Sequence, residues 1–165
     1  MKKLMLIILC ISFGCRGVSQ ENEIATTKTS DKQSYKVEKT DAQWKAELSD
    51  IEYYILRRAG TETPGSSELL NNKDEGTYVC AACGAPLFKS EHKFESGTGW
   101  PSFDREIEGQ VAFDVDYKIG YKRTEEHCAT CGGHLGHVFD DGPRATTGKR
   151  HCVNGAALDF IPKSD

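Results

Sequence analysis

The sequence has few methionines, few tryptophans, no excess of basic residues and no apolar run long enough to span a membrane. Its 165 residues include two methionines and two tryptophans, and 21 basic residues stand against 25 acidic ones. The apolar run from Leu4 to Phe13 is shorter than the roughly 20 residues that a transmembrane helix needs. Nucleic-acid binding normally requires a basic surface. The composition therefore predicts neither a transmembrane helix nor a nucleic-acid partner.

The first fifteen residues have the layout of an export signal. Lys2 and Lys3 precede the short apolar run, and Ser12-Phe13-Gly14-Cys15 resembles the cleavage box of bacterial lipoproteins. We expect residues 1–14 to be a signal peptide and the protein to be exported to the bacterial periplasm or cell envelope. Cys15 would be lipidated and attach the mature chain to a membrane. Plain secretion and a buried N-terminal helix are the alternatives.

The polar stretch after the leader predicts a flexible linker followed by one domain. Residues 15–40 are rich in Lys, Glu, Thr, Ser and Gln, with Tyr35 as their only aromatic residue. Such a segment cannot bury enough apolar surface to offset its ordering entropy. Residues 41–165 have the length of a single domain with one core.

The domain has short helical signals first and strand signals afterwards. Trp44, Leu48, Ile51 and Ile55 recur at helical spacing, and Ser49 to Glu52 fits a capping box. Gly60 and Pro64 predict the end of this helical part. Strand-like runs follow at 77–80, 94, 111–115, 119–123, 135–139, 152–153 and 158–161, separated by glycine and proline. We therefore expect a mainly β domain of compact, barrel-like antiparallel sheets with short N-terminal helices.

Two matched cysteine pairs predict a metal site. Cys80 and Cys83 form one C-x2-C pair, and Cys128 and Cys131 form a second pair after a gap of 44 residues. Two such knuckles supply four thiolates, which is the ligand set of a structural Zn²⁺. Disulfides or a thioredoxin-like redox pair are the alternatives that export would permit. Neither pair opens a helix of a βαβ unit, so we favour one structural Zn²⁺.

Cys152 is left without a cysteine partner in the domain. An odd cysteine of an exported protein is either a reactive thiol or the site of an intermolecular bond. Arg150 and His151 precede it, and both are residue types that lower a thiol pKa. Cysteine is also a common core residue, so burial in a strand is the alternative interpretation.

Three segments around Cys152 resemble the signature of type B methionine sulfoxide reductases, the family with a SelR-like domain. The resemblance runs from about Trp44 to Pro162. Its strongest parts are Gly97-Thr98-Gly99-Trp100-Pro101-Ser102-Phe103, His134-Leu135-Gly136-His137-Val138-Phe139 and Arg150-His151-Cys152-Val153-Asn154-Gly155.

The resemblance implies a role for each matching residue. Cys152 would attack the sulfur of methionine-R-sulfoxide, free or in proteins, and become a sulfenic acid. His137 and His134 would protonate or bind the oxygen. The remaining matches are Arg150 and Asn154 at the nucleophile, Trp100 at the methyl group, and Phe139 and Asp141 at the rim.

Three departures from the family pattern affect these expectations. Thr98 occupies the position of a recycling cysteine in many relatives, so an external thiol reductant, either a small thiol or a thioredoxin-like protein, must regenerate Cys152. Asp140 replaces a proline, and His151 replaces an aromatic residue beside the nucleophile.

Two rival functions remain open at this point. A non-enzymatic zinc-ribbon interaction module would leave Cys152 and its neighbours unexplained. A zinc hydrolase would need His134 and His137 as ligands, but four cysteines close the metal site and no carboxylate is suitably spaced.

Overall fold

The structure, a computed structural model, describes residues 34–164. The predicted leader and most of the predicted linker lie outside these residues. The end of the linker, residues 34–40, contacts the domain: the Val37 N–H donates to the Thr130 carbonyl oxygen at 3.0 Å. The Tyr35 ring lies 6.3 Å from the imidazole of His127. No helix within 34–164 has the length and apolar character of a membrane span.

Two short helices open the domain, as the sequence predicts. They are α1 (Asp41–Glu47) and α2 (Asp50–Arg58), and each begins with a capping box. In the second box the Ser49 side chain accepts from the Glu52 N–H, while the Glu52 carboxylate accepts from the Ser49 N–H at 2.7 Å. Trp44 and Ile55 are buried, whereas Ile51 is exposed even though it falls in the same predicted helical pattern.

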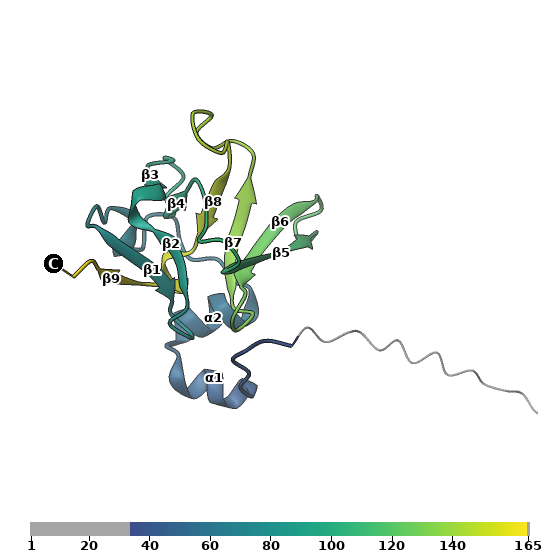
Figure 1. The fold of residues 1–165 in the computed structure, drawn as a ribbon. Coiled ribbons are helices and arrows are strands. Elements are labelled where there is room, and N and C mark those ends of the chain that lie inside the picture. The colour runs from purple at the N-terminus through teal and green to yellow at the C-terminus, as the bar shows by residue number, and fades with distance from the viewer. Residues whose placement is uncertain (1–33, 165) are drawn as a thin grey trace, which may run out of the picture. The chain divides into compact units, whose positions relative to one another are not determined.

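In the described part of the chain, nine strands form two antiparallel sheets (Figure 1). The smaller sheet has the order β2-β1-β9, and the larger has the order β3-β4-β8-β7-β6-β5. The strand bounds are β1 (Gly76–Cys80), β2 (Pro86–Lys89), β3 (Lys93–Phe94), β4 (Ser102–Phe103), β5 (Val111–Asp116), β6 (Arg123–Cys128), β7 (His134–Phe139), β8 (Arg150–Val153) and β9 (Leu158–Pro162). Single 3₁₀ turns are η1 (Glu68–Leu70), η2 (Ser90–His92) and η3 (Gly155–Ala157). The predicted antiparallel, mainly β class is confirmed as two sheets.

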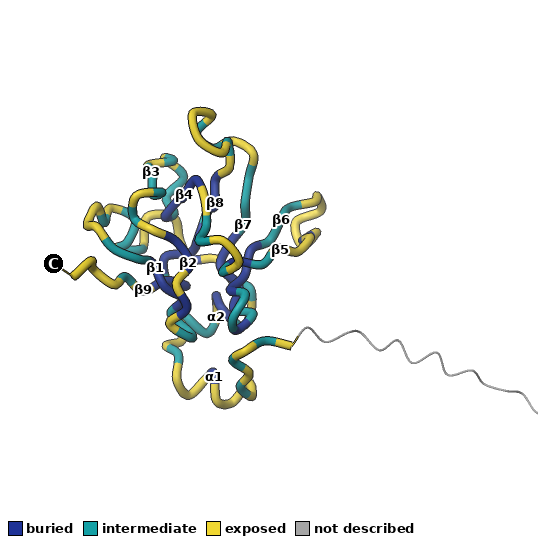
Figure 2. The backbone as a smooth tube through the Cα atoms, viewed as in Figure 1, coloured by how far each residue is buried: buried dark blue, intermediate teal, exposed yellow. Residues whose placement is uncertain are grey.

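The core lies where the helices and the inner strands meet (Figure 2). Phe88 and Phe103 stack with ring centroids 4.4 Å apart, and the Tyr78 ring packs edge-on against Phe103 at 4.9 Å. Such pairs contribute about 0.5–1.5 kcal/mol beyond the apolar area that they bury. These rings join the two sheets, because Tyr78 and Phe88 come from the smaller sheet and Phe103 from the larger.

One predicted strand, 119–123, is wrong except at its last residue. The alternation of Ile119, Tyr121 and Arg123 predicts a strand over 119–123, but β6 begins only at Arg123. Residues 117–122 form the turn between β5 and β6, and Ile119 and Tyr121 are exposed. Alternation predicts a strand only where one face is covered, and no part of the described chain covers these two side chains.

Candidate active site and four-cysteine cluster

Two similar turns bring the four predicted metal ligands together. In the first turn the Gly84 N–H donates to the Cys80 carbonyl oxygen at 2.7 Å, and in the second the Gly132 N–H donates to the Cys128 carbonyl oxygen at 2.8 Å. Both glycines have positive φ, 72° and 70°, a conformation that glycine adopts without a steric penalty. One turn follows β1 of the smaller sheet and the other follows β6 of the larger. The cluster therefore links the two sheets.

The spacing of the four sulfurs fits a tetrahedral metal and does not fit disulfides. All four Sγ atoms lie within 4.8 Å of one another. The Cys80–Cys131 sulfurs are 3.7 Å apart, and the Cys83–Cys128 sulfurs are 3.6 Å apart. A tetrahedral zinc with Zn–S bonds of about 2.3 Å separates its sulfurs by roughly 3.8 Å. A disulfide would require about 2.05 Å. The cluster is compatible with a zinc site.

Cys152 lies in the middle of the larger sheet. It pairs with Ser102 of β4 on one side and with His137 of β7 on the other. Directly opposite residues of antiparallel strands project to the same face. The Cys152 Sγ is also 3.8 Å from the Oγ1 of Thr98, the position of the recycling cysteine in many relatives. The structure therefore brings together Cys152, the predicted nucleophile, His137, one of the two predicted acids, and Thr98.

Burial and the nearby guanidinium of Arg150 shift the pKa of the Cys152 thiol in opposite directions. Burial raises the thiol pKa above its ordinary value, whereas the Thr98 hydroxyl and the Arg150 charge lower it without cancelling that effect. Asp141 holds Arg150 by two hydrogen bonds of 2.8 and 2.9 Å. The guanidinium also lies 4.5 Å from the Phe139 ring centroid. Arg150 is therefore fixed beside Cys152, but the free thiol remains protonated at neutral pH.

We expect the pH dependence of alkylation to report this balance. The rate of Cys152 modification by iodoacetamide, followed by peptide mass spectrometry, should reach half its maximum at a higher pH than an unstructured cysteine does. Arg150→Ala should move the midpoint further upward because a cation that favours the thiolate is removed. Lys149→Ala is the matched control, since the Lys149 ammonium pairs with exposed Asp140. A wild-type midpoint below that of the unstructured cysteine would contradict the prediction.

A β-bulge places both predicted histidines on the face that carries Cys152. Glu126 pairs with Gly136, but the next residue of β6, His127, pairs with His134, so that Leu135 is an extra residue in β7. In a regular strand, residues three apart project to opposite faces. The extra residue restores His134 to the face of His137, and their ring centroids are 5.6 Å apart.

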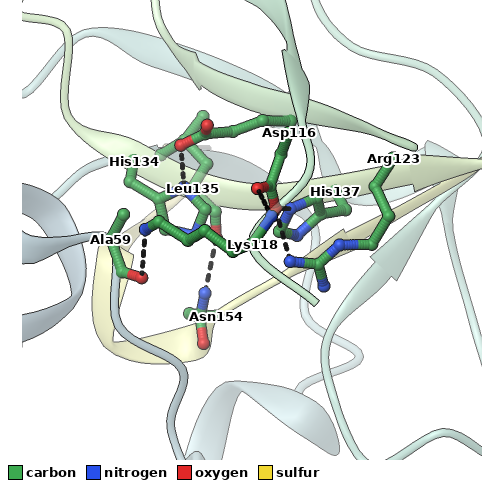
Figure 3. Close-up of polar contacts among 9 residues, drawn as sticks. Ala59, Asp116, Lys118, Arg123, His134, Leu135, His137 and Asn154 are labelled. Carbon is green, nitrogen blue, oxygen red and sulfur yellow. Dashed lines mark hydrogen bonds and ion pairs between the residues drawn. The ribbon is translucent and has the colours of Figure 1, made fainter. Parts of the chain in front are cut away.

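Each histidine is bound by a carboxylate that the sequence analysis did not single out. His137 Nε2 lies 2.8 Å from Oδ2 of Asp116, which also pairs with Arg123 (Figure 3). His134 Nδ1 lies 2.6 Å from Oε1 of Glu125. Burial lowers the pKa of His137 more than the Asp116 hydrogen bond raises it. A polar residue in an alternating strand carries no sequence signal of such a contact, so only the register of β5, β6 and β7 reveals these pairs.

Asn154 and Trp100, also predicted at the site, take different positions. The Asn154 side chain is occupied by backbone: its Nδ2 donates to the Leu135 carbonyl oxygen at 2.9 Å, and its Oδ1 accepts from the Glu62 N–H at 3.0 Å. Asn154 therefore fixes the bulge of β7 against the end of β8. Trp100 is half-buried, and its buried Nε1–H has no hydrogen-bond partner among residues 34–164.

His151 is not positioned to hold the thiolate, which corrects the sequence-based expectation. It precedes Cys152 in β8 and therefore projects to the other face of the sheet. Its Nδ1 lies 2.7 Å from Oε2 of fully buried Glu126, and its Nε2 lies 3.2 Å from Oε2 of Glu106. His151, where the family pattern has an aromatic residue, therefore forms a buried polar cluster with Glu126 and Glu106 on the face of the sheet opposite Cys152.

The sequence matches one protein-family model and many curated proteins. Residues 48–162 match the SelR domain. Proteins named peptide methionine sulfoxide reductase MsrB include one from Leptospira interrogans, 54% identical over 128 residues, covering 77% of this chain and 97% of the relative. The protein of that name from Leifsonia xyli is 49% identical over 135 residues, covering 81% and 97%. A third, from Bradyrhizobium diazoefficiens, is 51% identical over 140 residues, covering 84% and 98%.

Proposed function

The chain belongs to the SelR-domain family of peptide methionine sulfoxide reductases, and on that premise we propose that it reduces methionine-R-sulfoxide, free or in polypeptides, with Cys152 as nucleophile. The observation that carries the proposal is the register of β7 and β8, which sets Cys152 directly opposite His137. Arg150, fixed by Asp141, lies beside the thiol. A nucleophile, an acid and a cation at one place are what thiol attack on a sulfoxide requires.

The reaction transfers one oxygen atom and two electrons. The Cys152 sulfur attacks the sulfoxide sulfur while the oxygen receives a proton from a histidine. The products are methionine and a Cys152 sulfenic acid, a reversible oxidation state of cysteine. We assign the indole ring of Trp100 to packing against the substrate's methyl group, and Phe139 and Asp141 to the rim of the site.

We propose that the four-cysteine cluster holds one structural Zn²⁺. The sulfur spacing and the closed set of four thiols support this assignment. When bound, the metal supplies cross-linking of the two sheets and no chemistry at the substrate, because four cysteines leave no open coordination position. The same closed set disfavours the zinc-hydrolase alternative.

The test of the function is an assay on separated R and S epimers of a methionine sulfoxide peptide with dithiothreitol as reductant. We expect turnover of the R epimer only. Turnover to methionine would also be evidence against a zinc hydrolase, because hydrolysis does not change the oxidation state of the sulfur. No turnover of either epimer would favour the zinc-ribbon interaction module instead.

Recycling should depend on an external thiol. Within residues 34–164 the cysteines other than Cys152 all belong to the four-thiol cluster, and Thr98 offers only a hydroxyl at 3.8 Å. A first external thiol would form a mixed disulfide with release of water, and a second would release the Cys152 thiol. The reductant is therefore a small thiol or a thioredoxin-like protein.

A single turnover without reductant should leave a sulfenic acid on Cys152. We expect mass spectrometry to find dimedone bound at Cys152 and no new internal disulfide. Thr98→Cys is the informative comparison, because the introduced thiol should condense with the sulfenic acid and form a disulfide with Cys152 without added reductant. A disulfide between Cys152 and a cysteine of the cluster, formed as metal is released, would refute this scheme.

We also propose export, with residues 1–14 removed and Cys15 as a lipid attachment site. Support comes only from the charge, the apolar run and the cleavage box of the leader. A protein acting outside the cytoplasm would meet oxidised polypeptides of the envelope and need an exported reductant.

A further inference from the structure

The two histidines of the site use different ring nitrogens to contact their carboxylates. His137 contacts Asp116 through Nε2, at 2.8 Å, whereas His134 contacts Glu125 through Nδ1, at 2.6 Å. Neither Nδ1 of His137 nor Nε2 of His134 has a hydrogen-bond partner among residues 34–164. The nitrogen without a partner is therefore Nδ1 in His137 and Nε2 in His134.

Asp116 is surrounded by hydrogen-bond donors that favour its ionised form, in which it can only accept hydrogen bonds. It is the last residue of β5, and its side chain is buried between His137 and Arg123 (Figure 3). Its Oδ1 accepts from the Lys118 N–H at 2.7 Å. This backbone hydrogen bond, together with those from His137 and Arg123, holds the pKa of Asp116 well below its ordinary value despite burial. An ionised carboxylate only accepts, so Nε2 of His137 must carry the hydrogen.

Glu125 likewise accepts a hydrogen bond from a ring nitrogen of His134. It lies in β6 directly opposite His137 of β7, and its carboxylate reaches His134 at the other side of the bulge. The hydrogen bond from His134 lowers the pKa of Glu125. Because Glu125 is then ionised at neutral pH, Nδ1 of His134 carries the hydrogen.

We propose that Asp116 and Glu125 are positioning residues that hold the two histidines in opposite tautomers, so that His137 acts through Nδ1 and His134 acts through Nε2. The proposal rests on the proposed function and names how its acid works. The proton of the Cys152 thiol passes to the free Nδ1 of His137 and then to the sulfoxide oxygen. That oxygen, with its proton, ends on the Cys152 sulfur as the sulfenic acid, so that atoms, electrons and protons balance.

This route accounts for a nucleophile that is protonated in the free enzyme. Cys152 and His137 are direct cross-strand partners, and such residues have Cβ atoms about 4.5–5.5 Å apart. A base at this position generates the thiolate only when the sulfoxide is present to receive the proton. His134, through Nε2, would bind the oxygen or a water molecule beside it. Orientation of a histidine by a carboxylate on its second nitrogen is a known catalytic arrangement.

The first test measures the tautomers directly. The full-length zinc-loaded chain, labelled with ¹⁵N-histidine, would be examined by two-bond ¹H–¹⁵N correlation, with His137→Gln and His134→Gln used to assign the signals. We expect an Nε2–H tautomer for His137 and an Nδ1–H tautomer for His134. The reverse tautomer in either residue would overturn the proposal. This measurement involves no turnover, so it distinguishes failure of the proposal from failure of the proposed function.

The second test separates positioning from folding. Asp116→Asn replaces an obligate acceptor by an amide that can donate to Nε2. It should convert the His137 signal to the other tautomer and lower kcat for the R-sulfoxide about 10²-fold, with KM changed less than about twofold. Glu125→Gln should change only the His134 signal and lower kcat less. Asp114→Asn is the matched control, because Asp114 lies on the same face of β5, two residues earlier and exposed.

The outcomes are decisive even where a variant is less stable. Thermal unfolding monitored by circular dichroism shows whether Asp116→Asn is folded at the assay temperature, and Asp116→Glu should recover part of kcat if an anionic acceptor is what His137 needs. A folded Asp116→Asn variant with unchanged kcat and unchanged tautomer would refute the positioning role. A loss of kcat equal to that of the Asp114→Asn control would do the same.

Discussion

Cys152→Ser should abolish reductase activity, with kcat reduced on the order of 10⁴-fold or more, while the protein remains folded and keeps its metal. A serine hydroxyl is a far weaker nucleophile than a thiolate, and the sulfenic acid cannot form without the sulfur. The side chain is half-buried and its hydroxyl replacement can still contact Thr98, so the fold should change little. The measurements are steady-state turnover of the R epimer, zinc content and the midpoint of thermal unfolding.

Ser102→Ala provides a neighbour control for this variant. Ser102 pairs directly with Cys152 in β4 but contributes a hydroxyl that is bonded to Ser96. Its loss should lower activity far less than the loss of the thiol. Turnover retained by Cys152→Ser would remove Cys152 from the mechanism and require another nucleophile.

Cys80→Ser should act mainly on folding, with loss of the bound metal and of several kcal/mol of stability. Binding of zinc to structural sites of this kind contributes roughly 10–16 kcal/mol in small zinc-finger peptides, whereas domains are stable by only about 5–15 kcal/mol. Cys80 is fully buried at the end of β1, so the variant also leaves an unpaired hydroxyl in the core. We expect a partly unfolded, protease-sensitive protein, measured by circular dichroism and zinc analysis.

Chelation of the wild-type protein is the comparison for the metal ligand. Removal of zinc by a strong chelator should lower the unfolding temperature as the cysteine variant does, and readdition of zinc should restore it. A wild-type protein that lacks metal but unfolds at the same temperature would show that the cluster needs no zinc.

The sequence predicted those parts of the fold that depend on local or alternating patterns. The capping box at Ser49 and Glu52 and the strands around Val111, Leu135 and Leu158 follow from propensity and periodicity. Strand β2 (Pro86–Lys89) was missed because it has only two apolar residues, between Pro86 and Lys89, and so shows little strand pattern. The start of β6 was also predicted too early, since Ile119 and Tyr121 alternate like strand residues but lie in the turn before it.

Residue types and spacing predicted the four thiols and the Cys152 region, but they could not give the contacts between strands. Two histidines three residues apart on a regular strand would face opposite sides, and only the extra residue at Leu135 brings them together. Asp116 and Glu125 look like solvated acids of alternating strands until pairing places them against the imidazoles. Side-chain direction likewise decides that His151 and Cys152, adjacent in sequence, belong to different environments.

The bulge at Leu135 makes the site depend on how β7 pairs with β6 as well as on the composition of β7. Leu135 is fully buried, so exchange for another apolar residue of similar volume alters packing and leaves the face of each neighbour unchanged. Deletion of that residue would leave His134 and His137 two apart on a regular strand and therefore still on one face, whereas straightening of the bulge with every residue retained would turn His134 away from His137. The direction of the His134 side chain therefore depends on whether the bulge forms, which the residues at the other positions of β7 do not determine.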